Sequence, residues 1–113
     1  MQTYIKSVTF DCADALVVAR FWAAALGGEL TETSTSAKAL VEAPGWGGPE
    51  LWFQRVPEEK AGKLRMHFDL RAPDGVAAEV ERLIGLGATR AWETETGIVV
   101  LRDPEGNEFC VEE

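Results

Sequence analysis

The sequence predicts an α+β fold made of two copies of one βαβββ module. The first observation is a repeat, because residues 7–14 and 67–74 each read as a strand that ends in an aspartate. The second is that each copy continues into helix-forming residues and then a Leu-Gly pair, at residues 26–27 and 86–87, again sixty positions apart. A duplication of this length indicates two supersecondary units that share one core. The concave space between such halves is a natural place for a ligand.

The length and composition predict one domain spanning residues 1–113, with a core large enough to be stable without cross-links. No apolar run approaches the roughly 18 residues of a membrane span, and the first six residues lack the apolar region of a secretory signal. We therefore expect a cytoplasmic protein in which Cys12 and Cys110 are buried thiols rather than a disulfide. The formal charge of −8 argues against nucleic acid as a partner and is compatible with a cationic ligand.

The first module is expected to occupy residues 1–56. Alternating polar and apolar residues predict a half-buried strand over residues 5–12. Asp14 then stands where it can cap a helix expected over residues 15–26, since its carboxylate can accept from the free amides of the first turn. Gly27 ends this helix, because glycine readily adopts the left-handed conformation. The remaining strands are expected near residues 29–33, 37–42 and 50–56.

A charged linker over residues 57–63 leads to the second module, which is expected to occupy residues 64–113. Its first strand is expected over residues 65–71, with Asp74 as the cap of a helix that ends at Leu86. A turn over residues 103–107 has Asp first, Pro second and Gly where φ is positive. The other strands are expected near residues 89–93, 97–102 and 107–112.

Periodicity also predicts which faces are buried. The first helix should bury Val17, Phe21, Ala24 and Ala25, with Trp22 packing at the edge of this stripe, and the second should bury Val76, Val80, Leu83, Ile84 and Leu86. Strand alternation directs Phe10, Phe53, Phe68 and Phe109 toward the helices. The opposite strand faces should carry Thr9, Trp52, Gln54, His67, Asp69, Glu108 and Cys110.

Several motifs occur in a fixed order along nearly the whole chain: Phe21-Trp22 before Leu26-Gly27, His67-Phe68-Asp69-Leu70, Leu86-Gly87-Ala88, and residues 103–109. Their order and spacing resemble the vicinal oxygen chelate superfamily, which includes glyoxalase I, bleomycin-resistance proteins and extradiol dioxygenases. The nearest resemblance is to small bacterial glyoxalase-like domain proteins. It implies two βαβββ modules that curl into open half-barrels around a small organic molecule, in a homodimer.

Metal-dependent members of this superfamily place ligands on the first and last strands of both modules. His67 matches the usual histidine of the second module, whereas Ser7 stands at the equivalent position of the first. Cys110 stands where a glutamate is usual, and the last position falls on Trp52 or Gln54. Because a hard divalent ion needs several oxygen or imidazole donors in fixed geometry, we expect no metal site and no other cofactor.

Three polar residues of the second module are candidates for chemistry. His67 is the only histidine, and it could act as a general acid or base, donate a hydrogen bond to a ligand, or simply bond to a neighbour. Asp69 could orient His67, bind a cation, or form a salt bridge to Arg65 or Arg71. Glu108 shares a strand face with Cys110, which leaves open both a catalytic role and a shifted metal site.

The remaining candidates are aromatic residues and a thiol. Trp52 could be a stacking wall for a flat ligand or a packed core residue. Trp46 lies among glycines and could close over a cavity, dock on a partner subunit, or cover the end of a barrel. Cys110 is either a small buried filler or a nucleophile that only His67 could activate.

Two functions therefore stay open. The first is binding of a small molecule in an aromatic-lined cavity without a catalytic metal. The alternative is a lyase or isomerase of the glyoxalase-like group, with or without metal assistance, in which His67 and Glu108 or Asp69 transfer protons. The candidate ligand-binding residues are Thr9, Trp46, Trp52, Gln54, His67, Asp69 and Cys110.

Overall fold

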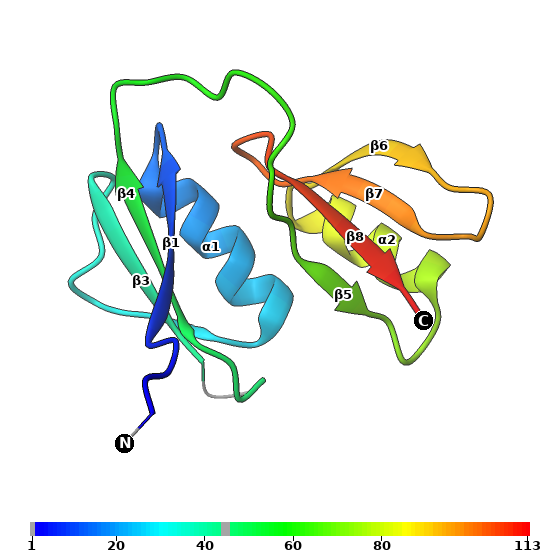
Figure 1. Cartoon of the computed structure of the whole chain (residues 1–113), viewed down its shortest axis with the longest axis horizontal. Helices are drawn as coiled ribbons and strands as arrows, with labels where there is room; N and C mark the ends of the chain where they lie inside the picture. Colours follow the sequence, from blue (N-terminus) through cyan, green and yellow to red (C-terminus); the bar gives the residue numbers. More distant parts are fainter. Residues whose placement is uncertain (1, 44–45) are drawn as a thin grey trace. The chain divides into compact units, whose positions relative to one another are not determined.

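A computed structural model describes residues 2–43 and 46–113 and divides the chain into two compact units. Unit 1 is Met1–Glu59, and unit 2 is Lys60–Glu113. Each unit is a βαβββ module with one helix and a mixed four-stranded sheet, as Figure 1 shows. The predicted fold class is confirmed. Among the described residues, no helix combines the length and the apolar character needed to cross a membrane.

The unit 1 sheet has the strand order β1–β4–β3–β2. Strand β1 is parallel to β4, while β3 is antiparallel to both β4 and β2. A parallel pair needs a long crossover connection, and helix α1 lies within the connection between β1 and β4. The strands are β1 (Ser7–Cys12), β2 (Glu29–Leu30), β3 (Lys38–Glu42) and β4 (Glu50–Arg55).

Helix α1 (Ala15–Leu26) has the predicted bounds because both of its ends are capped. The Asp14 carboxylate accepts hydrogen bonds from the backbone N–H groups of Leu16, at 3.1 Å, and Val17, at 3.3 Å. At the other end Gly27 has a φ of 69°, in the left-handed region. These caps satisfy polar backbone groups that the helix itself leaves unpaired.

The buried face of α1 is rotated from the predicted stripe. Val18 is fully buried and Trp22 nearly so, whereas Val17 is 47% exposed and Ala24 is exposed. The prediction for Val17 and Ala24 is wrong because every residue of this helix except Arg20 is apolar, so that several stripes fit the sequence equally well. Burial of Phe21 and Ala25 and the packing role of Trp22 are confirmed.

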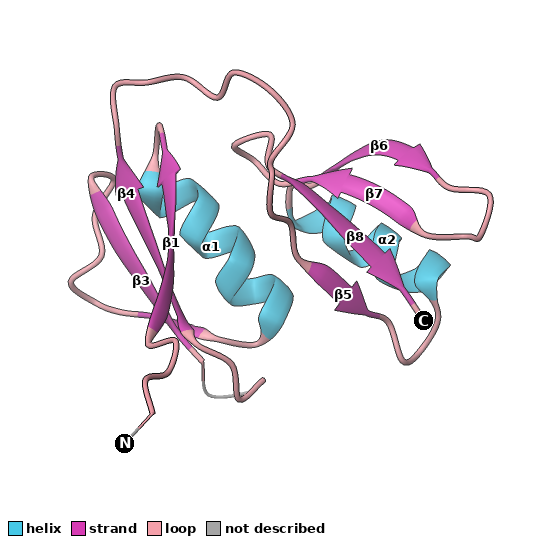
Figure 2. Ribbon diagram, in the orientation of Figure 1, coloured by secondary structure: helices cyan, strands magenta, loops and turns pink. Residues whose placement is uncertain are grey.

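The unit 2 sheet repeats this arrangement with the strand order β5–β8–β7–β6. Strand β5 (Asp69–Arg71) starts four residues later than the predicted strand, although the Phe68 carbonyl still accepts from the Cys110 N–H at 2.9 Å. Figure 2 shows the same pairing of one helix with one sheet in this unit. The other strands are β6 (Thr89–Glu93), β7 (Val99–Arg102) and β8 (Glu108–Glu112).

Helix α2 (Val76–Leu86) is not capped by Asp74, so this prediction is wrong. Gly75 occupies the cap position with a φ of 111°, and no side chain bonds to the free amides of the first turn. The Gly75 N–H instead donates to the Ala72 carbonyl at 3.1 Å, which closes a tight turn. Because this turn ends in a glycine with positive φ, the exposed Asp74 is left one residue outside the cap.

The cores lie between each helix and its sheet. Phe53 in unit 1 and Phe109 in unit 2 are almost completely buried, as predicted, while Phe10 and Phe68 are only half-buried. Phe10 stacks on Phe53 with 5.3 Å between ring centroids. On α2, Val80 and Leu83 are buried and Val76 half-buried, but the predicted burial of Ile84 and Leu86 is wrong, since both are more than one-third exposed.

The predicted turn between β7 and β8 is confirmed. The buried carboxylate of Asp103 accepts from the backbone N–H groups of Glu105, at 2.8 Å, and Asn107, at 3.0 Å. Gly106 has a φ of 85°, and its N–H donates to the Asp103 carbonyl at 2.9 Å. This turn therefore fixes where β8 begins.

The two repeat-related aspartates offer a matched test of capping. We expect Asp14→Ala to lower the free energy of unfolding by about 1 kcal/mol, because it removes two hydrogen bonds to α1. Asp74→Ala should change it very little, since this side chain caps nothing. Urea denaturation of both variants measures the difference, and equal losses would contradict the assignment of the caps.

Candidate functional site

The unit 1 sheet has one face opposite α1 that carries the predicted ligand-binding residues of its strands. The register pairs Thr9 with Trp52 on β1 and β4, so both side chains lie on the same face. Gln54 shares this face by alternation along β4. The neighbouring residues of β4, Leu51 and Phe53, are buried on the helix side. Trp52 is half-buried, whereas Thr9 and Gln54 are exposed.

Two contacts organise this face, and each involves a residue that the sequence reasoning missed. The Lys38 ammonium lies 5.1 Å from the centroid of the Trp52 ring, within the range of a cation–π contact. The Gln54 side-chain amide donates to the Asp11 carboxylate at 2.8 Å. Strand alternation could have added Asp11, because it continues the row of Thr9. No local pattern relates Lys38 to Trp52, since the pairing of β3 with β4 brings them together.

Trp46 is half-buried in the loop that precedes β4 rather than on the strand face of Trp52. A Cβ atom added at Gly28 would lie 2.9 Å from the Trp46 ring and 2.8 Å from the Val41 side chain. The indole therefore packs on the backbone just after α1, at a place where only glycine leaves room. This contact is a local packing reason for a tryptophan among glycines.

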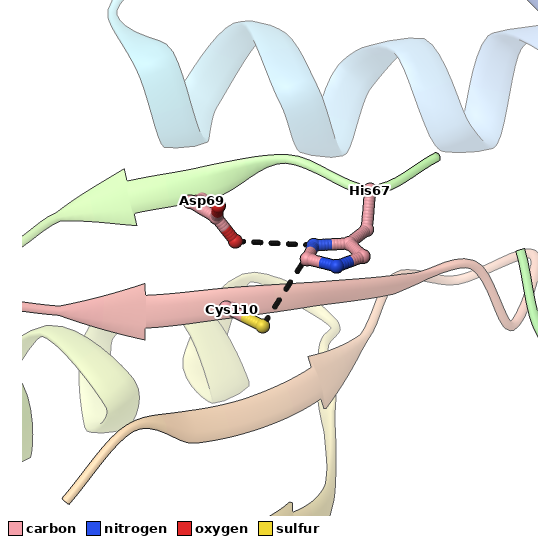
Figure 3. Close-up of side chains that lie close together, drawn as sticks. All are labelled: His67, Asp69 and Cys110. Atoms are coloured by element: carbon pink, nitrogen blue, oxygen red, sulfur yellow. Dashed lines mark hydrogen bonds and ion pairs between the residues drawn. The ribbon is translucent and has the colours of Figure 1, made fainter. Parts of the chain in front are cut away.

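Three predicted residues of unit 2 form a cluster, shown in Figure 3. His67 Nδ1 lies 3.0 Å from Asp69 Oδ1 and 3.9 Å from Cys110 Sγ. The ligand atoms of all three lie within 4.8 Å of one another. The parallel pairing of β5 with β8 sets Asp69 directly beside Cys110, and His67 lies two residues before Asp69 on the same side. We call these three residues the His67 cluster.

The contact between His67 and Asp69 defines what the imidazole can do. In a neutral imidazole, a proton on Nδ1 would donate to the Asp69 carboxylate, leaving Nε2 as the free acceptor. Both side chains are exposed, so a ligand could reach this acceptor. The arrangement suits hydrogen bonding to a ligand or removal of a proton from it.

The thiol of Cys110 is held in its protonated form. Burial raises the pKa of Cys110, and the charge of Asp69, its hydrogen bond and the charge of Glu112 raise it further. Because the thiolate is the nucleophilic form, this environment makes Cys110 a poor nucleophile at neutral pH. The thiol is better described as a small side chain that forms one wall of the His67 cluster.

The His67 cluster does not suit the hard metal ion that the superfamily resemblance would imply. It offers one imidazole, one carboxylate and one thiol, whereas a hard divalent ion takes mostly oxygen donors. Coordination through Cys110 would also require removal of a proton from a thiol whose pKa is raised. The donor set of the His67 cluster therefore does not match a hard-ion catalytic site.

Glu108 is engaged outside the His67 cluster, by the segment that leads into unit 2. Its buried carboxylate accepts from the Leu64 N–H at 3.0 Å and lies 3.1 Å from the Lys60 ammonium and 3.6 Å from Arg102 Nε. Lys60 also donates to the Gly62 carbonyl. Burial alone would raise the pKa of Glu108, but the backbone N–H of Leu64 and the Lys60 ammonium lower it to about 2. Such a carboxylate is a weak base.

A depression of about 360 Å³ lies elsewhere in unit 1. It is formed by the N-terminal residues and by the end of the loop before β4, and it takes in none of the predicted site residues. Its lining residues are Tyr4, Ile5, Lys6, Gly47, Gly48, Pro49 and Glu50.

Glu108 gives a prediction about acid stability. Its pKa lies below the ordinary value of 4.5, so the stability it contributes is fully present above pH 4.5 and is lost as the pH falls toward about 2. We expect Glu108→Gln to lower the free energy of unfolding by about 1–3 kcal/mol at neutral pH. The difference from the wild type should shrink below pH 4.5.

Denaturation at several pH values measures this effect. Glu112→Gln on the same strand is the control, because it makes the same change in net charge without removing the contacts to Lys60 and Leu64. A loss for Glu108→Gln that equals the control at every pH would contradict the role given to these contacts.

Comparisons with known proteins agree with this geometry. A family model described as a glyoxalase-like domain matches residues 7–112, and none of the curated proteins matches the chain. Among solved structures, a glyoxalase/bleomycin resistance protein/dioxygenase family enzyme from Burkholderia phytofirmans PsJN is 21% identical, with a TM-score of 0.70 and 94% coverage of both chains.

Two further structures share the fold at lower identity. A mutant of the fosfomycin resistance protein FosX from Listeria monocytogenes, complexed with Mn(II) and a dihydroxypropylphosphonic acid, has a TM-score of 0.75 at 14% identity, covering 98% of this chain and 90% of its own. The bleomycin-binding protein from Streptomyces verticillus, complexed with copper(II)-bleomycin, has a TM-score of 0.62 at 17% identity, covering 99% and 97%. From the family match and the fold, we conclude that the chain belongs to the glyoxalase-like domain family of the vicinal oxygen chelate superfamily.

Proposed function

We propose that this protein binds a small organic molecule at strand faces opposite its helices, without a catalytic metal. The observation that carries the proposal is the position of Trp52, whose indole lies on the open sheet face of unit 1 beside Thr9, Asp11 and Gln54. An aromatic surface with a few placed polar groups is the usual composition of a small-molecule site. The homodimer implied by the superfamily resemblance remains a prediction.

The two units offer different kinds of contact, and each is proposed as a binding surface in its own right. The Trp52 ring would stack on a flat part of the ligand, because its face is large and rigid. Around it, Asp11 and Gln54 already share a hydrogen bond and could exchange it for bonds to a ligand. In unit 2, the His67 cluster would offer the Nε2 atom as an acceptor. The bleomycin-binding protein of Streptomyces verticillus, which shares the fold, supports binding of an organic molecule as the kind of function to test.

A second function is favoured by the contact between His67 and Asp69. A carboxylate 3.0 Å from the imidazole orients it for proton transfer, which is the chemistry that a small lyase or isomerase would need. Asp69 suits this role better than Glu108, because Glu108 is bound by Lys60 and Leu64 and has a pKa of about 2. Turnover of a screened compound that is abolished by His67→Gln would favour this enzyme over a simple binding protein.

The binding proposal predicts a contrast between site and core. Trp52→Ala should abolish binding of a screened compound that is held on the unit 1 face, and His67→Ala binding of one that is held at the His67 cluster. Both should cost less stability than a core substitution, because Trp52 is half-buried and His67 is exposed. Phe109→Ala should cost about 3–5 kcal/mol of unfolding free energy, because it leaves a cavity in a packed core. Thermal melts and titrations measure both effects. Unfolding of the first two variants, with a neutral Phe109→Ala, would show that the assigned site is the core.

The proposed lack of a catalytic metal gives a separate prediction. We expect only weak binding of Ni²⁺, Zn²⁺ or Mn²⁺, because the donor set is small and Cys110 must first lose a tightly held proton. Calorimetry of the untagged protein measures this affinity. Tight one-to-one binding of any of these ions that disappears in His67→Ala would refute the proposal of a metal-free site.

A further inference from the structure

The sheet face that carries Trp52 is acidic. The strand register puts four carboxylates on this face and, among its described residues, one ammonium group, that of Lys38. The carboxylates come from all four strands of the unit 1 sheet: Asp11 on β1, Glu50 on β4, Glu42 on β3 and Glu29 on β2. An anionic ligand would therefore be repelled from this face, whereas a cation would be attracted to it.

Two of these carboxylates are placed against each other. Glu29 and Glu42 are direct partners in the antiparallel pair of β2 and β3, and both are exposed. Like charges directly opposite each other on neighbouring strands destabilise a sheet. A cation bound nearby would relieve this repulsion. The face is therefore expected to attract positive charge in addition to that of Lys38.

The Trp52 ring already holds a cation. The Lys38 ammonium lies 5.1 Å from the ring centroid, and Lys38 is exposed on a flexible four-carbon stem. At an exposed site such a contact is weak, so that a ligand can replace it at small cost. Lys38 therefore occupies the position that the charged group of a ligand would take, and it can move away into solvent.

We infer that the ligand of this face is a planar aromatic cation, which stacks on Trp52, displaces Lys38 and is held by the surrounding carboxylates. This inference rests on the proposed small-molecule function and adds the chemical class of the ligand. The flat ring system of the ligand would stack on Trp52. Its protonated group would be attracted by Asp11 and the other carboxylates. Asp11 and Glu50 lie nearest to Trp52 in the strand register, since Gln54, the partner of Asp11, and Glu50 itself are each two residues from Trp52 on β4.

Three flat probes of different charge test the inference. Proflavine is a planar cation at neutral pH, acridine at slightly alkaline pH is a nearly isosteric neutral molecule, and anilinonaphthalene sulfonate is an anion. We expect proflavine to bind about tenfold more tightly than acridine at low salt, with the advantage falling at high salt, and the anion to bind weakest. Titrations use the full chain.

Variants of the same face provide the sharper readout. Lys38→Met should tighten proflavine binding about threefold or more, because it removes a competing cation and one positive charge from the face. Arg20→Met is the control, since it removes the same charge from the exposed side of α1, which covers the other face of this sheet, and should leave the affinity unchanged. Asp11→Asn, which keeps an acceptor for Gln54, should weaken proflavine binding severalfold but not acridine binding.

The outcomes separate this inference from the proposed function. Equal affinity for the three probes, lost in Trp52→Leu, would overturn the preference for a cation while supporting a small-molecule site at Trp52. Proflavine binding that is unchanged in both Trp52→Leu and Lys38→Met would overturn the inference, because the probe would then bind elsewhere. If Trp52→Leu fails to fold, the Lys38→Met variant alone decides. Proflavine binding that is weaker or unchanged in Lys38→Met would then overturn the inference.

Discussion

Parallel pairing of the first strand with the last strand of each module determines most of what this molecule can do. It places β1 beside β4 and β5 beside β8, so that residues about 40 positions apart in the sequence become neighbours. Thr9 meets Trp52 and Asp69 meets Cys110 only through this pairing. It also requires a crossover, and the helix in that crossover covers one face of the sheet. The other face is left open for chemistry.

The two modules use the same scaffold for different purposes. In unit 1 the open face combines an indole with carboxylates, which favours stacking and attraction of positive charge. In unit 2 it combines an imidazole, a carboxylate and a thiol, which favours directed hydrogen bonding at one nitrogen atom. The two modules thus share the order and pairing of their strands and helices, while the side chains on the open faces differ. The His67 cluster of unit 2 lacks the oxygen-rich surroundings of a hard metal ion.

Local sequence patterns predicted the helices, the strands and the strand faces. They could not predict contacts between residues that are distant in the sequence. The sequence identified Asp14 as a helix cap because capping depends on neighbouring residues. The same prediction for Asp74 was wrong because Gly75, with its positive φ, occupies the cap position of α2. Alternation correctly grouped Trp52 with Gln54 and His67 with Asp69. The contacts of Lys38 with Trp52 and of Lys60 with Glu108 join distant segments, and no local pattern relates them. The contact with Lys60 lowers the pKa of Glu108, which makes the predicted acid–base role of Glu108 less favourable.

The surroundings of Cys110 have a consequence for the behaviour of the protein under oxidative stress. Peroxides react with thiolates, and the first product is a sulfenic acid that would add bulk and polarity beside His67. Because burial and the Asp69 and Glu112 carboxylates favour the thiol, this reaction should be slow at neutral pH. The same carboxylates that make Cys110 a poor nucleophile therefore protect the cluster, so that its shape should persist in the presence of mild oxidants.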